Sequence, residues 1–257
     1  MAGLEVGDPR RFDGQVAIVA GGASGIGRAS ALRLASLGAT VVLADYAEEP
    51  LAKTLAELVD AGHTATSHVT DISDPDSVQS LVDHAGQHGD VSVLVNSAGI
   101  TGPLDRPVHE LALDEFRRTV EINLWGTVYL TKALLPQMLA AGYGRMMHVA
   151  SIAGKEGNPH MSPYNISKAG LIGFVKGAAK EYATKGITIN AIAPAVIRSP
   201  MVEDQPEDTL NYMLARIPMK RMGEPEEVAE VIAFAVSRAC SFTTGVVFDA
   251  SGGRATY

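Results

Sequence analysis

The sequence predicts an α/β protein in which helices cover both faces of a parallel sheet. Short apolar runs alternate along the chain with longer amphipathic stretches, which is the pattern of repeated strand and helix units. Neighbouring parallel strands need a crossover connection, and helices must cover both faces of such a sheet. Seven strand patterns and six helical patterns therefore predict a doubly wound, seven-stranded parallel sheet in a single domain spanning residues 1–257.

The predicted strands are short runs rich in Val, Ile, Leu and Ala, as buried parallel strands are. They cover residues 15–20, 40–45, 64–69, 91–95, 145–150, 187–192 and 245–250. The helical patterns between them cover about residues 25–37, 47–61, 75–88, 110–141, 163–185 and 225–237. Residues 1–12 are expected to form a loose arm. Residues 193–225 contain five prolines and predict a long loop with a short helix near 208–216, a lid over a substrate site.

Composition and charge disfavour several classes of function. The chain has 21 Lys and Arg against 29 Asp and Glu, a formal charge of −8, so neither nucleic acid nor an anionic membrane is an expected partner. No apolar run reaches the length of a membrane-spanning helix, and the start of the chain has no secretion segment. The single cysteine, Cys240, can form no internal disulfide, and no Cys/His spacing resembles a zinc site. A cytoplasmic protein without a metal is expected.

A glycine-rich turn directly follows the first predicted strand. Gly21, Gly25 and Gly27 have the spacing G-x-x-x-G-x-G and open the next helix. Glycines at such a turn let backbone N–H groups approach a pyrophosphate, and the helix N-terminus adds partial positive charge. A turn kept tight for packing alone would have similar glycines. Asp45, 18 residues beyond Gly27 at the end of the second strand, favours a dinucleotide, because its carboxylate can accept hydrogen bonds from an adenosine ribose. The alternative role for Asp45 is to cap the next helix.

A second group of residues has the composition of a proton-transfer site. Tyr164 and Lys168 are four residues apart and share one helical face, and Ser151 lies 13 residues before the tyrosine at the end of a predicted strand. Ser162 as N-cap and Pro163 at the first helical position predict where this helix starts. Tyr164 then lies in the first turn, where the helix dipole and the Lys168 ammonium both favour the phenolate. An isolated pair of this kind is commonly a surface pair, but the serine and the glycine turn favour a reactive tyrosine.

The chain resembles the short-chain dehydrogenase/reductase family from about residue 12 to residue 257. The resemblance rests on the glycine turn, on Asp71-Ile72 after the third strand, on the run Asn96-Ser97-Ala98-Gly99, and on the Ser, Tyr and Lys above. It implies a Rossmann-type fold, NAD as cofactor, and interconversion of a secondary alcohol and a ketone on a small-molecule substrate. It also implies a homotetramer in which the helices near 110–141 and 163–185 pack against their symmetry mates.

The resemblance also assigns roles to the reacting groups. Tyr164 would be the general acid/base on the reacting oxygen, Ser151 would hold that oxygen, and Lys168 would bind the nicotinamide ribose while acidifying the tyrosine. Asn123 would support a bound water that relays protons. Asn is a poor helix former and Gly126 follows three residues later, which predicts a local distortion of this helix. The alternative is an Asn that only satisfies its own helix.

The expected binding residues follow from the same resemblance. The loop from Pro194 to Ser199 is similar to the family's P-G-x-x-x-T loop over the nicotinamide, with Ala195 in place of Gly and Ser199 in place of Thr. The expected cofactor site comprises Gly21, Ser24, Gly25, Ile26, Gly27, Asp45, Asp71, Ile72, Asn96, Ala98, Gly99, Tyr164, Lys168, Pro194, Ile197 and Ser199. The expected substrate site comprises Ser151, His160, Tyr164, Ala195 and Met201.

The sequence favours a small polar substrate. The stretch GKEGNP at residues 154–159 and the ending GGRATY resemble dehydrogenases of sugars and 2-keto-3-deoxy sugar acids, which predicts such a substrate with NAD as acceptor. One alternative is a 3-oxoacyl-carrier-protein reductase, which Asp45 disfavours because those reductases usually use NADPH. Another is a non-catalytic dinucleotide sensor on the same fold, which the presence of all four reacting groups disfavours.

Overall fold

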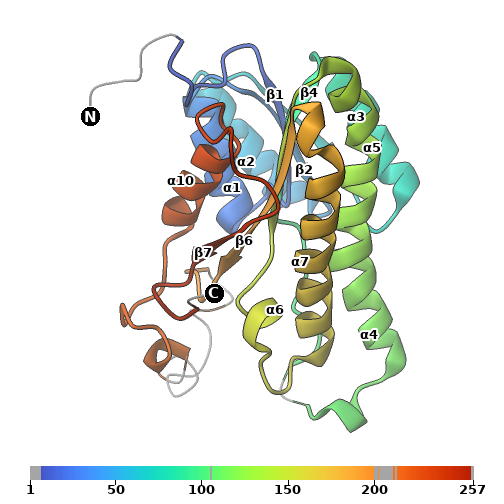
Figure 1. Cartoon of the computed structure of the whole chain (residues 1–257), viewed down its shortest axis with the longest axis vertical. Helices are drawn as coiled ribbons and strands as arrows, with labels where there is room; N and C mark the ends of the chain where they lie inside the picture. Colours follow the sequence, from blue (N-terminus) through green and yellow to red (C-terminus); the bar gives the residue numbers. More distant parts are fainter. Residues whose placement is uncertain (1–6, 105, 200–201, 203–210, 212, 256–257) are drawn as a thin grey trace.

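The computed structural model describes residues 7–104, 106–199, 202, 211 and 213–255. Within these residues seven strands form one sheet in the order β3-β2-β1-β4-β5-β6-β7, and every neighbouring pair is parallel (Figure 1). The strands are β1 (Val16–Ala20), β2 (Thr40–Asp45), β3 (Ala65–Val69), β4 (Val91–Asn96), β5 (Gly144–Val149), β6 (Ile187–Pro194) and β7 (Val247–Ala250). The predicted doubly wound fold is therefore confirmed.

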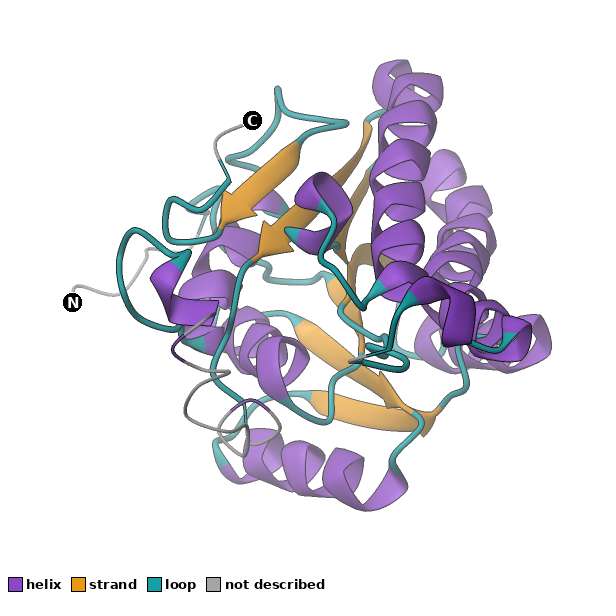
Figure 2. Cartoon of the chain, turned by 90° about the horizontal axis from the view of Figure 1, so that it is seen from below, coloured by secondary structure: helices purple, strands orange, loops and turns teal. Residues whose placement is uncertain are grey.

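Helices cover both faces of the sheet (Figures 1 and 2). One face carries α1 (Gly25–Ser36), α2 (Glu48–Asp60) and α10 (Pro225–Ala235), and the other carries α3 (Pro75–Gly86), α4 (Leu113–Val120), α5 (Gly126–Ala141) and α7 (Ser162–Tyr182). A short helix, α6 (Ala153–Glu156), follows β5. The chain winds outward in opposite directions from β1 and β4, so a crevice opens beyond the carboxyl ends of these two strands, where such folds bind ligands.

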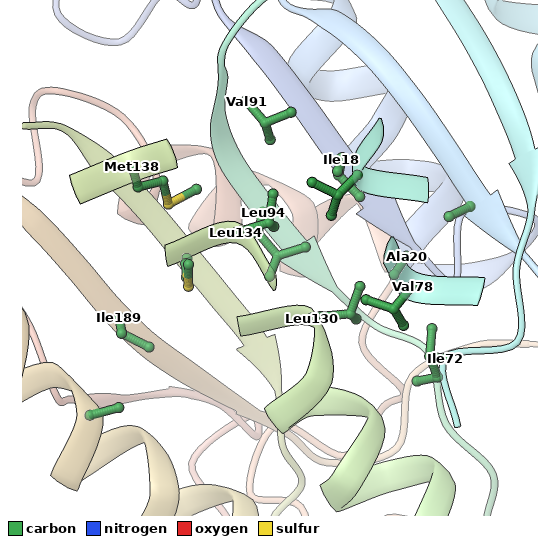
Figure 3. Close-up of a cluster of buried hydrophobic side chains, with 14 of the residues drawn as sticks. Ile18, Ala20, Ile72, Val78, Val91, Leu94, Leu130, Leu134, Met138 and Ile189 are labelled. Carbon is green, nitrogen blue, oxygen red and sulfur yellow. The ribbon is translucent and has the colours of Figure 1, made fainter. Parts of the chain in front are cut away.

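A separate apolar cluster lies on each face of the sheet. The cluster under α3, α5 and α7 includes Ile18, Leu94, Leu130, Leu134 and Met138, all fully buried (Figure 3). The strands supply side chains to both clusters because successive residues point to opposite faces. Burying one such Leu or Met side chain stabilises the fold by about 1.5–3 kcal/mol, which fixes the strand ends that carry the polar residues of the site.

The long helix predicted for 110–141 is divided. A 3-10 turn (Val108–Glu110) comes first, and α4 and α5 are joined by a π-helical segment, Glu121–Trp125. Asn123 is the central residue of this segment, so the predicted local distortion is confirmed. The wider turn directs the Asn123 side chain away from its own helix toward Ile100 and Ser167, and the alternative of an Asn serving only its own helix is wrong.

Three expectations about chain segments need correction. The loose arm is wrong for its described part, because Phe12 is fully buried, its N–H donates to the Leu37 carbonyl, and the Pro9 carbonyl accepts from Ala239. Residues 193 and 194 belong to β6 rather than to the following loop, because they pair with β7. Ser162 is not the N-cap of α7: the helix begins at Ser162, and Met161 holds the cap position without a side-chain hydrogen bond.

In the region predicted as a short helix, Asn211 and residues 213–215 are helical, and the other residues of 208–212 lie outside the described part.

Candidate active site

The glycine turn between β1 and α1 leaves room for a phosphate. Gly21 has φ +78°, and a Cβ there would lie 2.6 Å from the Ala98 nitrogen. A Cβ on Gly27 would collide with the Gly21 carbonyl, whereas the space beside Gly25, at φ +50°, is open. The N-cap residue Ser24 makes no side-chain bond to the first turn of α1, so the N–H groups of that turn remain available for an anion.

Asp45 ends β2 beside this turn, and its carboxylate has a fixed orientation. Oδ2 accepts from the Ala23 N–H at 3.1 Å, and Oδ1 accepts from the Ala47 N–H at 3.0 Å. The next residue, Tyr46, is 75% exposed and carries no cation that could balance a 2′-phosphate. Arg28, the basic residue after the last glycine, donates to both carboxylate oxygens of Glu57 at 2.5–2.9 Å. These contacts suit a free ribose diol better than a phosphorylated one.

A cleft of about 470 Å³ runs from Asp45 to the end of β5. Eleven of the sixteen expected cofactor residues line it: Gly21, Ser24, Gly25, Ile26, Asp45, Asp71, Ile72, Ala98, Gly99, Ile197 and Ser199. It is also lined by eight residues outside the expected binding set, of which Ser97 and Arg198 lie in motifs named above: Tyr46, Thr70, Ser97, Ile100, Arg118, Ile122, Val149 and Arg198. Most of these adjoin predicted positions and could have been found from them, whereas Arg118 and Ile122 reach the cleft from α4 and the π-helical segment only through the tertiary fold.

The other expected cofactor residues lie behind the wall of the cleft. Asn96 is buried, and its side chain donates to Thr127 at 3.0 Å and accepts from the Ala98 N–H at 3.2 Å, so it shapes the loop after β4. Gly27 packs against the glycine turn, and Pro194 ends β6. Ser97 donates to the Gly21 carbonyl at 3.3 Å, which joins the two loops that form this end of the cleft.

Ser151, Tyr164 and Lys168 meet at the carboxyl end of β5. Lys168 is buried, and its Nζ donates to the Val149 carbonyl at 2.7 Å. A Cβ on Gly99 would lie 3.5 Å from this Nζ, so the ammonium adjoins the wall of the cleft. The Tyr164 ring centroid is 5.7 Å from the same nitrogen, and Ser151 lies close enough to its hydroxyl to act on the tyrosine pKa. The predicted placement of Tyr164 in the first turn of α7 is confirmed.

The electrostatics of this set differ in one respect from the expectation. Burial raises the pKa of Tyr164, although the hydrogen bond with Ser151 acts to lower it. The ammonium of Lys168 faces the tyrosine ring and donates to a carbonyl, so it does not reverse the effect of burial. Burial also lowers the pKa of Lys168 to about 8. The expectation that the phenolate is favoured is therefore wrong for the protein alone.

Asn123 joins three parts of the site. Its Oδ1 accepts from the Ile100 N–H at 2.8 Å, and its Nδ2 donates to the Ile100 carbonyl at 2.8 Å and to Ser167 at 3.0 Å. Both ends of the amide are therefore engaged with protein groups. The loop after β4, which includes Gly99, is held against α7, which carries Tyr164 and Lys168.

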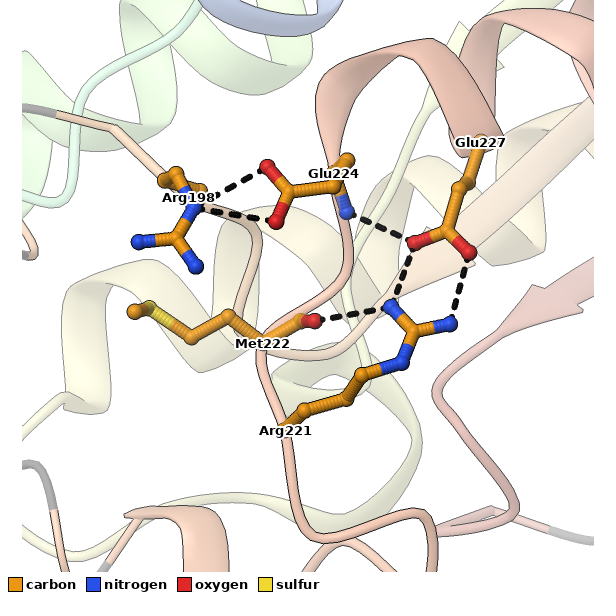
Figure 4. A network of polar contacts seen from close by, with 5 residues as sticks. All are labelled: Arg198, Arg221, Met222, Glu224 and Glu227. Carbon is orange, nitrogen blue, oxygen red and sulfur yellow. Dashed lines mark hydrogen bonds and ion pairs between the residues drawn. The ribbon is translucent and has the colours of Figure 1, made fainter.

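The loop after β6 is held by charged and backbone contacts. The Arg198 N–H donates to the Gly223 carbonyl at 2.8 Å, and its Nε donates to Glu224 at 3.0 Å. Arg221 donates to Glu227 at 2.7 Å, and the Glu224 N–H donates to Glu227 at 2.9 Å (Figure 4). These contacts join the loop to the start of α10, so Ile197 and Ser199 are fixed where they line the cleft.

The expected substrate residues are only partly brought together. Ser151 and Tyr164 are in contact, whereas His160 is exposed, with φ +61°. Ala195 lines a second cavity of about 300 Å³ behind the loop, and Met201 lies outside the described residues. Within the described part of the chain, no group of three His, Cys, Asp or Glu residues has the geometry of a metal site, and no helix is long and apolar enough to cross a membrane.

The cleft has a phosphate-binding turn with an acidic partner, and a serine, a tyrosine and a buried lysine adjoin its wall at the end of β5; this combination defines a dinucleotide-dependent oxidoreductase. The family model described as "Enoyl-(Acyl carrier protein) reductase" matches residues 21–255. The chain belongs to the short-chain dehydrogenase/reductase family and is an NAD-dependent oxidoreductase that acts on CH–OH groups.

Individual relatives are similar over their whole length. The 2-dehydro-3-deoxy-L-rhamnonate dehydrogenase (NAD(+)) of Sphingomonas sp. (strain SKA58) is 46% identical over 248 residues, which are 96% of this chain and 98% of that protein. The 3-oxoacyl-[acyl-carrier-protein] reductase of Thermotoga maritima is 38% identical, covering 95% and 98%. The crystal structure of NAD+-bound xylitol dehydrogenase has a TM-score of 0.90 and 34% identity, covering 94% and 99%.

Proposed function

We propose that this oxidoreductase oxidises a secondary alcohol of a sugar or of a 2-keto-3-deoxy sugar acid, or reduces the corresponding ketone. The observation that carries the proposal is that Ser151, Tyr164 and Lys168 gather beside Val149, which lines the cleft, while Asp45 lines the cleft beside the glycine turn. The first group suits proton transfer at an alcohol oxygen, and the second suits an unphosphorylated adenosine ribose.

The residues of the chain have distinct parts in this reaction. NAD, when bound, supplies the acceptor for the hydride. Tyr164 takes the hydroxyl proton of the alcohol, and the Ser151 hydroxyl donates a hydrogen bond to the oxygen as negative charge develops there. Lys168 stands beside Gly99 at the cleft wall, where its ammonium can hold a ribose hydroxyl and stabilise the phenolate. Asn123 holds the loop after β4 in place, so Gly99 and Lys168 keep their spacing.

Support for a sugar-type substrate comes from the relatives and from the loop after Ser151. The Sphingomonas relative is named for a deoxy sugar acid, and the structural neighbour for a polyol. In this chain the loop supplies Asn158 and His160, which offer hydrogen bonds to hydroxyl groups. The acyl-carrier-protein reductase is the second candidate, supported by the Thermotoga relative. Asp45 argues against it, because its carboxylate disfavours the NADPH that such reductases usually use.

A substrate screen tests the proposal. NADH formation should be measured with sugars, sugar acids including 2-dehydro-3-deoxy-L-rhamnonate, polyols, hydroxyacyl thioesters and hydrophobic alcohols. We expect the highest kcat/KM with a sugar acid. A preference for acyl thioesters over every sugar acid would refute the substrate class. No turnover with any alcohol would favour the alternative of a non-catalytic dinucleotide sensor.

The proposal includes a cytoplasmic homotetramer. Several apolar side chains of α4, the π-helical segment and α7 are exposed, including Leu113, Trp125 and Ile166, and Trp125 stacks on Tyr129. A second copy of these helices would cover them, as the family resemblance implies. Cys240 is buried as a free thiol, which is compatible with a reducing compartment. Sedimentation should give a tetramer, and a monomer would remove this part of the proposal.

A further inference from the structure

The C-terminal segment 249–255 lies against the loop that follows Ser151 (Figure 1). Arg254 donates to Glu156 Oε2 through Nε at 3.1 Å and through Nη2 at 2.9 Å, and Nη2 also donates to Asn158 Oδ1 at 3.0 Å. Only 8% of the Arg254 side chain is exposed. A buried guanidinium from the far end of the chain therefore contacts two residues of the candidate substrate loop.

The segment that carries Arg254 is itself ordered by polar contacts. Asp249 Oδ1 accepts from the N–H and the hydroxyl of Ser251, and the Ser251 hydroxyl accepts from the Ala255 N–H at 3.0 Å. The other oxygen of Asp249 lies 3.6 Å from Lys155 Nζ, one residue before Glu156. Two ion pairs of opposite polarity thus join α6 to this segment, which limits how far the two can slide against each other.

Asn158 is held from a second direction by α7. Its N–H donates to Asn165 Oδ1 at 3.1 Å, and its carbonyl accepts from Asn165 Nδ2 at 2.7 Å. Asn165 is the neighbour of Tyr164 in the chain. The backbone of Asn158 is therefore tied to the helix of the reactive tyrosine, and its side chain is tied to Arg254.

A residue with a strained backbone follows these contacts in the chain. His160 adopts φ +61°, a left-handed conformation that non-glycine residues disfavour and that persists only where neighbouring structure imposes it. It follows Asn158 by two residues and precedes Tyr164 by four. If the loop relaxed, His160 would leave this conformation, and the segment that leads into Tyr164 at the start of α7 would change shape.

We propose that Arg254 is a positioning residue for the substrate site. Through Glu156 and Asn158 it holds loop 157–160 against α7, the helix that carries Tyr164, and so maintains the left-handed conformation at His160. This inference rests on the proposed function for its kinetic consequence, but its structural part does not depend on the substrate. The planar guanidinium reaches two acceptors at once, which the single ammonium of a lysine does not match.

The test compares Arg254→Met, Arg254→Lys and Glu156→Gln with Arg33→Met. Arg33 pairs with Glu230 at 2.9 Å and joins α1 to α10, so its variant also loses an ion pair between elements but leaves the loop untouched. With 2-dehydro-3-deoxy-L-rhamnonate and NAD+, we expect kcat/KM to fall by about 10- to 100-fold in Arg254→Met, through a higher KM for the sugar acid. Arg254→Lys should recover only part of the loss. The Kd for NAD+ should change by less than about twofold, and Arg33→Met should match the wild type.

Hydrogen exchange provides a readout that needs no substrate. Amides of residues 153–161 should exchange faster in Arg254→Met and Glu156→Gln, and at the wild-type rate in Arg33→Met. Unchanged exchange in the Arg254 and Glu156 variants would overturn the inference, whether or not the sugar acid is turned over. If exchange rises as expected while the sugar acid is inert, the proposed substrate fails and the positioning role stands.

A charge exchange separates positioning from direct contact with the substrate. The double variant Glu156→Arg with Arg254→Glu restores an ion pair of reversed polarity. Partial recovery of kcat/KM and of slow exchange relative to Arg254→Glu alone would support the inference. If Glu156→Gln keeps the wild-type KM for the sugar acid while Arg254→Met has a higher KM, Arg254 binds the substrate itself and the positioning role is wrong.

Discussion

Replacing Asn123 with alanine should reduce both stability and activity. Asn123 is fully buried in the π-helical segment and makes three hydrogen bonds, two to the backbone of Ile100 and one to Ser167. Each such bond contributes about 1 kcal/mol net, and more where a partner is left buried and unpaired. Loss of all three predicts a decrease of about 3 kcal/mol in the free energy of unfolding. For a chain of this size about 2–4 °C of Tm corresponds to each kcal/mol, so the expected decrease in Tm is about 6–12 °C.

Calorimetry on the protein without and with NAD+ measures this effect. Asn123→Asp is a second variant, because it has nearly the same shape and keeps the acceptor for the Ile100 N–H but places a carboxylate oxygen against the Ile100 carbonyl. It should be no more stable than the alanine variant, because the position is fully buried. We also expect a lower kcat, because Ile100 follows Gly99, which adjoins Lys168 Nζ. A Tm within about 2 °C of the wild type together with unchanged kcat/KM would refute the reasoning.

Three further predictions concern the cofactor, the chemistry and the pH dependence of stability. The wild type should prefer NAD+ to NADP+, and Asp45→Ala should narrow the ratio of their kcat/KM values; equal values in the wild type would contradict the assignment. Tyr164→Phe should lose turnover while keeping the Kd for NAD+, and because burial raises the pKa of Tyr164, oxidation by the wild type should accelerate toward alkaline pH. Burial lowers the pKa of His148 to about 3, so the folded protein binds fewer protons than the unfolded chain below about pH 6.5, and stability is lost as the pH falls through that range. Relative to its value at pH 7, the wild type should lose about 2 kcal/mol more than His148→Gln by pH 5, and parallel stability curves would count against this linkage.

Much of the fold follows from patterns that act locally. The observed strands differ from the predicted ones by at most two residues at either end, because most of them are buried apolar runs bounded by turns. The division of the helix predicted for 110–141 could be predicted only in part from the sequence. Asn123 and Gly126 indicate a distortion, but the π-helical geometry depends on Ile100 and Ser167, which come from other parts of the chain.

The features of the site also fall into two groups, those that local sequence patterns predict and those that depend on tertiary contacts. The positions of the glycine turn, Asp45, Tyr164 and Lys168 could be predicted because each depends on spacing within one or two elements. The sign of the Tyr164 pKa shift could not, because it depends on burial that the sequence does not state. The contact of Arg254 with Glu156 joins residues 98 positions apart, and no local pattern marks it.

Transfer of the carbinol hydrogen tests the central claim most directly. The substrate with the highest kcat/KM in the screen should be deuterated at its carbinol carbon and oxidised with NAD+, and the reduced cofactor analysed by mass spectrometry. We expect one deuterium in the cofactor with the wild type, and no reduced cofactor with Tyr164→Phe under the same conditions. Reduced cofactor without deuterium, or equal turnover by Tyr164→Phe, would contradict it.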